Sequence, residues 1–165
     1  EDALRIVTHH WSDNPMKGYP DYVKLDSMIA NGQLKNIDFV IIGRWPAEIQ
    51  WKATTTHGPT HGAQLADLLR GCHVYLTASQ WEPGGMNHVE GTQCGLPVLY
   101  HQDGGGIVER ASKFGIEYSD DLKSAVENMK DQYMAFRKQV LHNPPPTGDE
   151  MCLRTIDLIQ QLLVS

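Results

Sequence analysis

Two glutamates flank a glycine-rich turn near the middle of the chain. Glu82 and Glu90 lie eight positions apart within the stretch QWEPGGMNHVEGTQCGLPVLY, residues 80–100. A carboxylate accepts hydrogen bonds from a vicinal diol, as an acid does on the ribose of a nucleotide. Two acids on the two sides of a phosphate-binding turn could hold two sugars, one at each end of a diphosphate. The pattern therefore suggests a nucleotide-sugar as the ligand.

Two further turns could take part in binding the same ligand. Residues 9–18 follow a strand-like run and include Lys17, and residues 101–106 follow another strand and include Gly104 and Gly105. Glycine lets a ligand approach the backbone closely. The free N–H groups and dipole of a helix start favour a phosphate, each contributing about 0.3–1 kcal/mol. One turn proves little, but three converging turns could hold a diphosphate.

Strand-like and helix-like segments alternate along the chain and would position these turns. Strands are predicted over 4–9, 37–43, 52–56, 73–78, 97–101 and 115–118, and helices over 21–30, 64–70, 87–94, 107–113, 121–141 and 149–163. This order predicts an α/β fold, a Rossmann-like parallel sheet of about six strands with helices on both faces. Such a sheet binds ligands at the carboxyl ends of its strands, where the three turns would meet. In the last helix we expect one apolar stripe to be buried: Leu153, Ile156, Ile159 and Leu163.

The bulk properties exclude several classes of protein. A length of 165 residues suits one domain with a real core, and a net charge of −6 argues against nucleic acid as a partner. No apolar run approaches the roughly 18–20 residues that span a bilayer, so we expect no transmembrane segment. Cys72, Cys94 and Cys152 show no disulfide or zinc spacing. Reduced thiols of this kind predict a cytoplasmic protein.

The motif around the two acids resembles a known family. Glu82, seven residues, Glu90, then "CGLPV" from Cys94 and a later Gly104-Gly105-Gly106 are similar to the C-terminal, donor-nucleotide-binding domain of glycosyltransferase family 4 (group 1). Members of that family are retaining enzymes of the GT-B fold, which transfer a sugar from a nucleotide-diphosphate sugar to an acceptor. The resemblance covers nearly the whole chain.

The resemblance implies roles for individual residues. Glu82 would be catalytic and face the transferred sugar, Glu90 would bind the ribose diol, and Trp45 would lie near the nucleotide base. The residues that we expect to bind the donor are Lys17, Gly84, Gly85, Met86, Asn87 and Glu90. Further candidates, not all of which come from the resemblance, are Arg44, Thr60, Gly104 and Gly105. The family needs no cofactor, because the nucleotide-sugar is its substrate, and no metal, because helix dipoles and basic groups stabilise the leaving diphosphate.

The histidines do not form the pattern of a metal site. His57 and His61 have i, i+4 spacing, but Gly58 and Pro59 between them exclude a shared helix face. No cysteine lies at zinc spacing, and no Asp-x-Asp pair is present. His88, at the start of the motif helix, has two open interpretations, which are contact with a ligand and packing.

Two departures from the family pattern bear on function. Ser12 stands where the family usually has an arginine. Phosphate neutralisation would then depend on Lys17 and backbone amides, with His9, His10 or Arg44 as further candidates. The family's N-terminal domain, which binds the acceptor and usually supplies a catalytic histidine, is absent from these 165 residues. We therefore expect residues 1–165 to form one donor-binding domain that works with its own N-terminal domain, shows little catalysis alone, and makes any peripheral membrane contact through that other domain.

Three alternative functions stay open. An NAD(P)-dependent oxidoreductase would need G-x-G-x-x-G after the first strand, and the HWSDN found there counts strongly against this function. A sugar-nucleotide epimerase of the same fold would carry its extra catalytic acids largely in the missing half. A non-catalytic nucleotide-binding or interaction module would have lost its site, against which Glu82, Glu90 and Lys17 argue. The base, the sugar and the acceptor are not fixed by the sequence.

Overall fold

Six parallel strands form the single sheet of the computed structural model, which describes residues 3–164. The strands are β1 (Leu4–His10), β2 (Ile37–Gly43), β3 (Thr55–His57), β4 (Val74–Thr77), β5 (Val98–His101) and β6 (Gly115–Tyr118). Their order across the sheet is β3-β2-β1-β4-β5-β6. The chain thus runs outward from β1 to one edge and then from β4 to the other edge. This arrangement creates a crevice at the carboxyl ends of β1 and β4.

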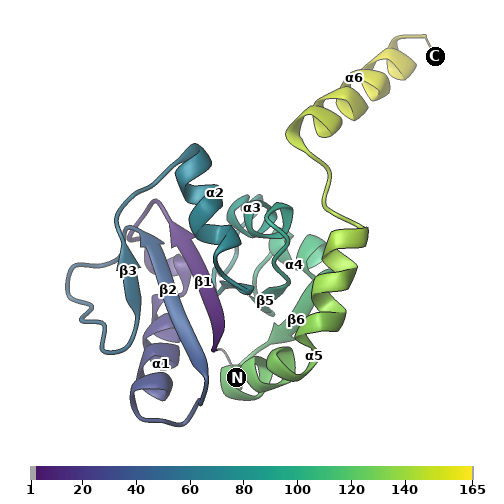
Figure 1. Ribbon diagram of the computed structural model, residues 1–165. Helices are drawn as coiled ribbons and strands as arrows, with labels where there is room; N and C mark the ends of the chain where they lie inside the picture. The colour runs from purple at the N-terminus through teal and green to yellow at the C-terminus, as the bar shows by residue number, and fades with distance from the viewer. Residues whose placement is uncertain (1–2, 165) are drawn as a thin grey trace.

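Helices follow most of the strands (Figure 1). They are the short 3₁₀ helix η1 (Pro15–Lys17) and the α-helices α1 (Tyr19–Ala30), α2 (Gly62–Arg70), α3 (Asn87–Gln93), α4 (Gly106–Ala111), α5 (Leu122–His142) and α6 (Gly148–Val164). The predicted Rossmann-like α/β class is confirmed. Element identities agree with the sequence prediction, and most boundaries differ by only a few residues.

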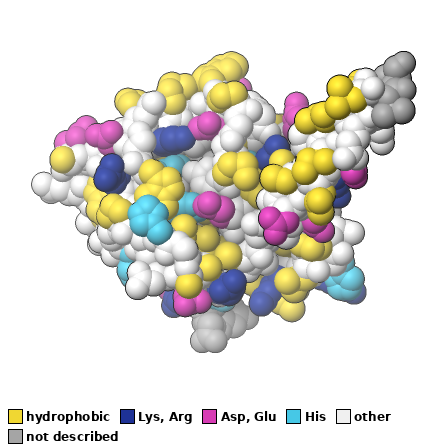
Figure 2. Space-filling model, turned by 90° about the horizontal axis from the view of Figure 1, so that it is seen from above, with side chains coloured by type: hydrophobic (Ala, Val, Ile, Leu, Met, Phe, Trp, Pro, Cys, Tyr) yellow, Lys and Arg dark blue, Asp and Glu magenta, His cyan; other side chains and the backbone are white. Residues whose placement is uncertain are grey.

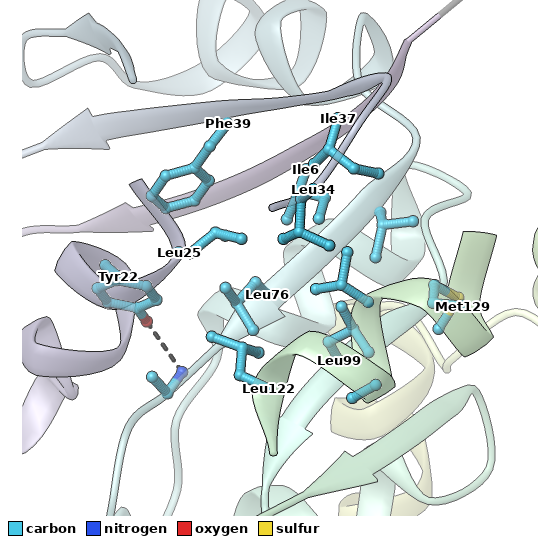
Figure 3. Packing of buried hydrophobic residues seen from close by; sticks show 14 of the residues in the cluster. Ile6, Tyr22, Leu25, Leu34, Ile37, Phe39, Leu76, Leu99, Leu122 and Met129 are labelled. Carbon is cyan, nitrogen blue, oxygen red and sulfur yellow. Dashed lines mark hydrogen bonds between the residues drawn. The ribbon is translucent and has the colours of Figure 1, made fainter. Parts of the chain in front are cut away.

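The sheet is buried on both faces. Alternate residues of one strand enter different clusters, since Ile6 packs with α1 and α5 whereas Val7 packs with α2 and α4. Burial on both faces explains the near-continuous apolar run of β2. Figure 3 shows Leu25 of α1 and Leu122 of α5 meeting the strand residue Leu76. Each fully buried side chain of this size contributes roughly 1.5–3 kcal/mol.

A buried carboxylate determines where β3 begins. Asp26 of α1 accepts hydrogen bonds from the backbone N–H groups of Lys52, Ala53 and Thr54 and from the Thr54 hydroxyl, at 2.6–3.2 Å. Burial alone would raise the pKa of Asp26, but these hydrogen bonds lower it overall. Because the N–H groups of residues 52–54 turn to Asp26, the strand predicted over 52–56 begins only at Thr55.

The last helix does not bury its apolar stripe. The sequence correctly predicts a break around Pro144, but the predicted burial is wrong, since Leu153 is 61% and Leu163 80% exposed. Figure 1 shows α6 projecting from the body of the molecule, and Figure 2 shows hydrophobic side chains along this arm. The physical reason is that no element within residues 3–164 lies against that face. None of the described helices is long and apolar enough to cross a membrane.

Candidate functional site

The three loops after β1, β4 and β5 meet at the carboxyl edge of the sheet, as the sequence predicts. The N–H of Gln80 donates to the carbonyl of Met16 at 2.9 Å, which joins the first loop to the second. The N–H of Trp81 donates to the carbonyl of Asp103 at 2.8 Å, which joins the second loop to the third. The region is therefore one connected surface built from backbone contacts.

Two glycines make this close approach possible. Gly18 has φ +79°, and a Cβ there would lie 2.0 Å from the carbonyl oxygen of Ala78. Gly105 has φ +65°, and its Cβ would lie 2.9 Å from the carbonyl oxygen of Glu82, with which it forms an isolated β-bridge. Both positions combine a left-handed backbone with a tight contact, which L side chains tolerate poorly. Gly18 and Gly105 therefore have a structural role that does not depend on any ligand.

Glu82 is held by an ion pair between loops. Its Oε2 lies 2.6 Å from Nζ of Lys17, and its side chain is 24% exposed. Gly85 lies against the aliphatic part of the Glu82 side chain, where an added Cβ would be 2.7 Å from Cγ of Glu82. Gly84, in contrast, is exposed and has no neighbour within 4 Å of an added Cβ. The ion pair thus holds a carboxylate and an ammonium group side by side, and both remain partly accessible to solvent.

Glu90 of α3 is held by a buried histidine. Its Oε2 lies 2.7 Å from Nε2 of His9, whose side chain is 1% exposed, whereas the glutamate side chain is 46% exposed. The opposite ring nitrogen, Nδ1 of His9, lies 3.1 Å from the hydroxyl of Tyr75. Burial raises the pKa of Tyr75 well above its usual value, so the phenol keeps its proton. A polar chain from Tyr75 through His9 thus orients the carboxylate.

Asn87 and His10 extend this network beneath the site. Nδ2 of Asn87 donates to the carbonyl of His9 at 3.2 Å and lies 3.3 Å from Nδ1 of His10. Nε2 of His10 lies 2.8 Å from the hydroxyl of Tyr22. Burial, with smaller effects from His9 and Lys17, lowers the pKa of His10 to about 3, so its ring is neutral near pH 7. This excludes His10 as a cation for a phosphate.

The other predicted residues lie around this centre. Gly104 is buried in the β5–α4 turn, and the exposed Met86 caps α3 and accepts a weak contact from Nη1 of Arg110 at 3.8 Å. Arg44 is exposed beyond β2 and lines a hollow of about 570 Å³ together with Trp45.

Thr60 lies farther toward the β3 side of the edge. Its hydroxyl donates to the carbonyl of Gly58 at 2.9 Å. The next residue, His61, stacks on Trp11 with ring centroids 4.4 Å apart, which brings this loop against the end of β1. The structure thus places Lys17, Glu82, Asn87 and Glu90 at the junction of β1 and β4, with Arg44 and Thr60 at its flank.

The sequence does not reveal the partners of Glu90. It suggests His9 only as a candidate for phosphate neutralisation, and Tyr75 only as part of a strand. His9 and Glu90 are 81 positions apart, and His9 and Tyr75 are 66 apart. The one signal that could have found them is a histidine in a strand otherwise buried on both sides. Within residues 3–164, no group of three His, Cys, Asp or Glu side chains could hold a metal ion.

Comparison with solved structures shows that several enzymes and other proteins share this fold. The sucrose-phosphate synthase of Thermosynechococcus elongatus is 18% identical, with a TM-score of 0.69 over 99% of this chain and 46% of that one. WaaG, a glycosyltransferase of lipopolysaccharide biosynthesis, is 14% identical, with a TM-score of 0.71 over 91% of this chain and 45% of that one. Anabaena HepE, solved in complex with UDP, is 16% identical, with a TM-score of 0.63 over 84% and 43%. The chain spans less than half of each of these three proteins.

Sequence comparison gives the family directly. No curated protein sequence matches this chain. The family model for glycosyl transferases group 1 matches residues 6–115, which include the loops after β1, β4 and β5. With its fold, its converging loops and its two oriented glutamates, this chain belongs to the glycosyl transferases of group 1.

Proposed function

We propose that this chain is the donor-binding half of a retaining, metal-independent glycosyltransferase of family 4. The enzyme transfers a sugar from a nucleotide-diphosphate sugar to an acceptor. The observation that carries the proposal is the pair of glutamates at one sheet edge, Glu82 held by Lys17 and Glu90 held by His9. HepE, which shares the fold, was solved in complex with UDP, and this supports a nucleotide-sugar as the ligand.

Glu90 would hold the ribose of the donor. Its contact with His9 uses Oε2, which leaves Oε1 of the exposed carboxylate to accept a ribose hydroxyl. Because Nε2 of His9 donates to it from a buried position, the carboxylate is oriented before the ligand arrives. A fixed acceptor of this kind loses little conformational entropy on binding. The hollow lined by Arg44 and Trp45 would take the base.

Lys17 and Glu82 would exchange partners when the donor binds. Lys17 would turn from the carboxylate to the diphosphate, together with backbone N–H groups around Gly85 and Asn87. Glu82, freed from its ion pair, would face the transferred sugar. A cation and backbone dipoles that are aimed at the leaving diphosphate stabilise the charge that develops on it during transfer. These are the roles that the residues have by resemblance to the family.

The acceptor would be bound by the enzyme's own N-terminal domain. This chain covers 46% of the sucrose-phosphate synthase and 45% of WaaG, which supports a second domain of similar size. The isolated domain would then bind donor but transfer almost no sugar. We place the enzyme in the cytoplasm, with any peripheral membrane contact made by the N-terminal domain.

Nucleotide binding by this domain tests the proposal. UDP, GDP, ADP and NAD would each be titrated, with thermal unfolding and calorimetry as readouts. A ligand at about 100 times its dissociation constant stabilises the fold by about 2.7 kcal/mol. We expect one nucleoside diphosphate to bind and Glu90→Gln to weaken it tenfold or more. Glu117→Gln, an exposed acid on β6, is the matched control.

The outcomes separate the competing functions. Binding of NAD alone would support an oxidoreductase and overturn the proposal. Equal affinity in Glu90→Gln and Glu117→Gln would remove Glu90 from the site. In the longer enzyme, Glu82→Gln is expected to abolish sugar transfer while leaving nucleoside diphosphate binding within about threefold. Conversion of the nucleotide-sugar to its epimer, without transfer, would indicate the epimerase.

A further inference from the structure

A second cavity lies on the other side of α3 from Glu90. It has a volume of about 610 Å³ and is bounded by α3, the end of α4, the end of α5 and the start of α6. From α3 it takes residues 88, 89 and 92, whereas residue 90 points elsewhere because of the helical repeat. Cavities that bind small ligands typically measure about 300–1,000 Å³. The space is therefore large enough for a small ligand and separate from the position of Glu90.

Hydrogen bonds between elements fix the walls of this cavity. Nε2 of Gln93 donates to the carbonyl of Pro146 at 3.1 Å, which ties the segment before α6 to α3. Nε2 of Gln139 donates to the carbonyl of Lys113 at 2.7 Å, which ties α5 to the chain after α4. The cavity is thus built by four elements that are joined to one another.

A buried histidine without a partner lines the cavity. His88 is 2% exposed, and among the described residues neither Nδ1 nor Nε2 of its ring has a hydrogen-bond partner. Burial, followed by the charge of Arg110, lowers the pKa of His88 to about 4, so the ring is neutral near pH 7. A neutral imidazole has one N–H donor and one acceptor. Buried polar groups are normally paired, so this ring is available to a ligand.

Positive charge gathers around the same cavity. Arg110, Lys113 and Arg154 line it from α4, from the segment after α4, and from α6. Within residues 3–164 none of the three forms an ion pair with a carboxylate, although the whole chain has a net charge of −6. Arginine binds phosphate oxygens with two parallel N–H groups. Three unpaired cations suit a phosphate dianion.

The remaining walls are apolar. Val89, Phe114, Pro144 and Met151 contribute much of the lining. An anion alone would leave these side chains in contact with water, whereas an apolar group attached to it would cover them. We propose that this cavity is a second ligand site, which binds a phosphate monoester carrying an apolar group through Arg110, Arg154 and His88. The proposal stands independently of the function proposed for the donor site.

Calorimetry with n-octyl phosphate tests the site. We expect the wild-type domain to bind this probe and to bind n-octanol at least tenfold more weakly. The double variant Arg110→Gln, Arg154→Gln is expected to lose affinity tenfold or more. The control Lys35→Gln, Lys138→Gln removes the same charge from exposed positions outside the cavity and is expected to change affinity less than twofold. In spectra of ¹⁵N-histidine protein, the probe is expected to shift the ring nitrogens of His88.

Two further arms identify the source of the phosphate. Vesicles of phosphatidylcholine with and without phosphatidic acid test a lipid headgroup, and phenyl phosphate tests a soluble monoester that carries an apolar group. Whichever of these ligands binds the wild-type domain more tightly is expected to bind equally well to the Lys35→Gln, Lys138→Gln control. It is expected to lose its binding to the Arg110→Gln, Arg154→Gln variant. Glu90→Gln is expected to leave octyl phosphate affinity unchanged, so a failure of the donor site and a failure of this site are distinguishable.

Several results would overturn the proposal. The wild-type domain could fail to bind octyl phosphate, or could bind octanol as tightly as octyl phosphate. The two double variants could also lose affinity for octyl phosphate equally. Unchanged His88 nitrogen shifts at saturation would place the probe elsewhere and would also overturn it.

Discussion

The two glutamates of the site lie at the same sheet edge but are supported differently. Glu90 is on a helix and is oriented by His9, which is buried in β1 and contacts Tyr75 in β4. Glu82 is on a loop and is oriented by Lys17, the last residue of the short 3₁₀ helix η1 after β1. One acid is thus fixed by the core of the fold, and the other by a contact that both partners can leave.

This difference suggests a division of labour within the donor site. A fixed acid suits a part of the ligand that is common to every donor molecule and stays in place. An exchangeable ion pair suits the phosphate and sugar, where charge moves during the reaction. The stability of the fold should therefore depend on the support of Glu90 more than on the Lys17–Glu82 pair.

The largest effect is expected from Gly18→Ala, which would disrupt the backbone packing next to Lys17, the partner of Glu82. The substitution puts a Cβ 2.0 Å from the carbonyl oxygen of Ala78 at a φ of +79°. We expect a loss of about 3 kcal/mol or more in the free energy of unfolding, measured in urea. Gly84→Ala, where nothing lies within 4 Å, is expected to change it by less than about 0.5 kcal/mol. Similar losses in both would contradict the close packing of the loops.

The pH dependence of stability tests the buried polar network of His9, His10 and Asn87 that lies next to Glu90. The pKa of His10 is about 3 in the folded protein and about 6.5 in the unfolded chain, so the unfolded chain binds more protons below pH 6.5. The free energy of unfolding should therefore fall with decreasing pH between about 6.5 and 3. His10 alone contributes a slope of up to about 1.4 kcal/mol per pH unit.

Urea unfolding at pH 7.5, 6.5, 5.5 and 4.5 measures this slope. His88 contributes in the same direction, because its pKa is lowered to about 4. His10→Asn should therefore reduce the slope without abolishing it. An unchanged slope in His10→Asn would show that His10 is not held neutral.

Tyr75→Phe removes one hydroxyl and should weaken the support that His9 gives to Glu90. It leaves Nδ1 of the buried His9 without its partner, which costs about 1–3 kcal/mol. It should also weaken nucleoside diphosphate binding, because the ring that orients Glu90 is less constrained. Tyr100→Phe is the control, since that hydroxyl makes no hydrogen bond within the described part of the chain. Equal effects of the two substitutions on affinity would argue against orientation through His9.

The smallest effect on stability is expected from the Lys17–Glu82 pair. A double-mutant cycle with Lys17→Gln and Glu82→Gln should give a coupling energy of about 1 kcal/mol or less, because a partly exposed ion pair gains little over water. Lys17→Gln should nevertheless reduce nucleoside diphosphate affinity severalfold. A coupling energy above about 2 kcal/mol would show that the pair is a fixed structural element like the support of Glu90.

The sequence predicted the elements and the meeting of the loops because both follow from local pattern. Apolar runs and turn residues predict alternating strands and helices, and a parallel sheet brings strand ends together. The later start of β3 followed from one carboxylate, Asp26, whose partners lie 26–28 positions away. The support of Glu90 by His9 and Tyr75 needed the strand order, which periodicity does not give. The stripe of α6 showed that the helix is amphipathic, but an amphipathic pattern does not show where its partner is.

The projecting helix α6 also has a consequence for the hydrodynamic shape. A compact domain of this length has a radius of gyration of about 15 Å. A helix of 17 residues extends about 25 Å, so an arm of this size adds scattering mass far from the centre. Small-angle X-ray scattering should therefore give a larger radius and a pair-distance distribution with a long tail. The tail would shorten in any state in which the arm packs against another surface, which makes scattering a direct measure of what the arm does.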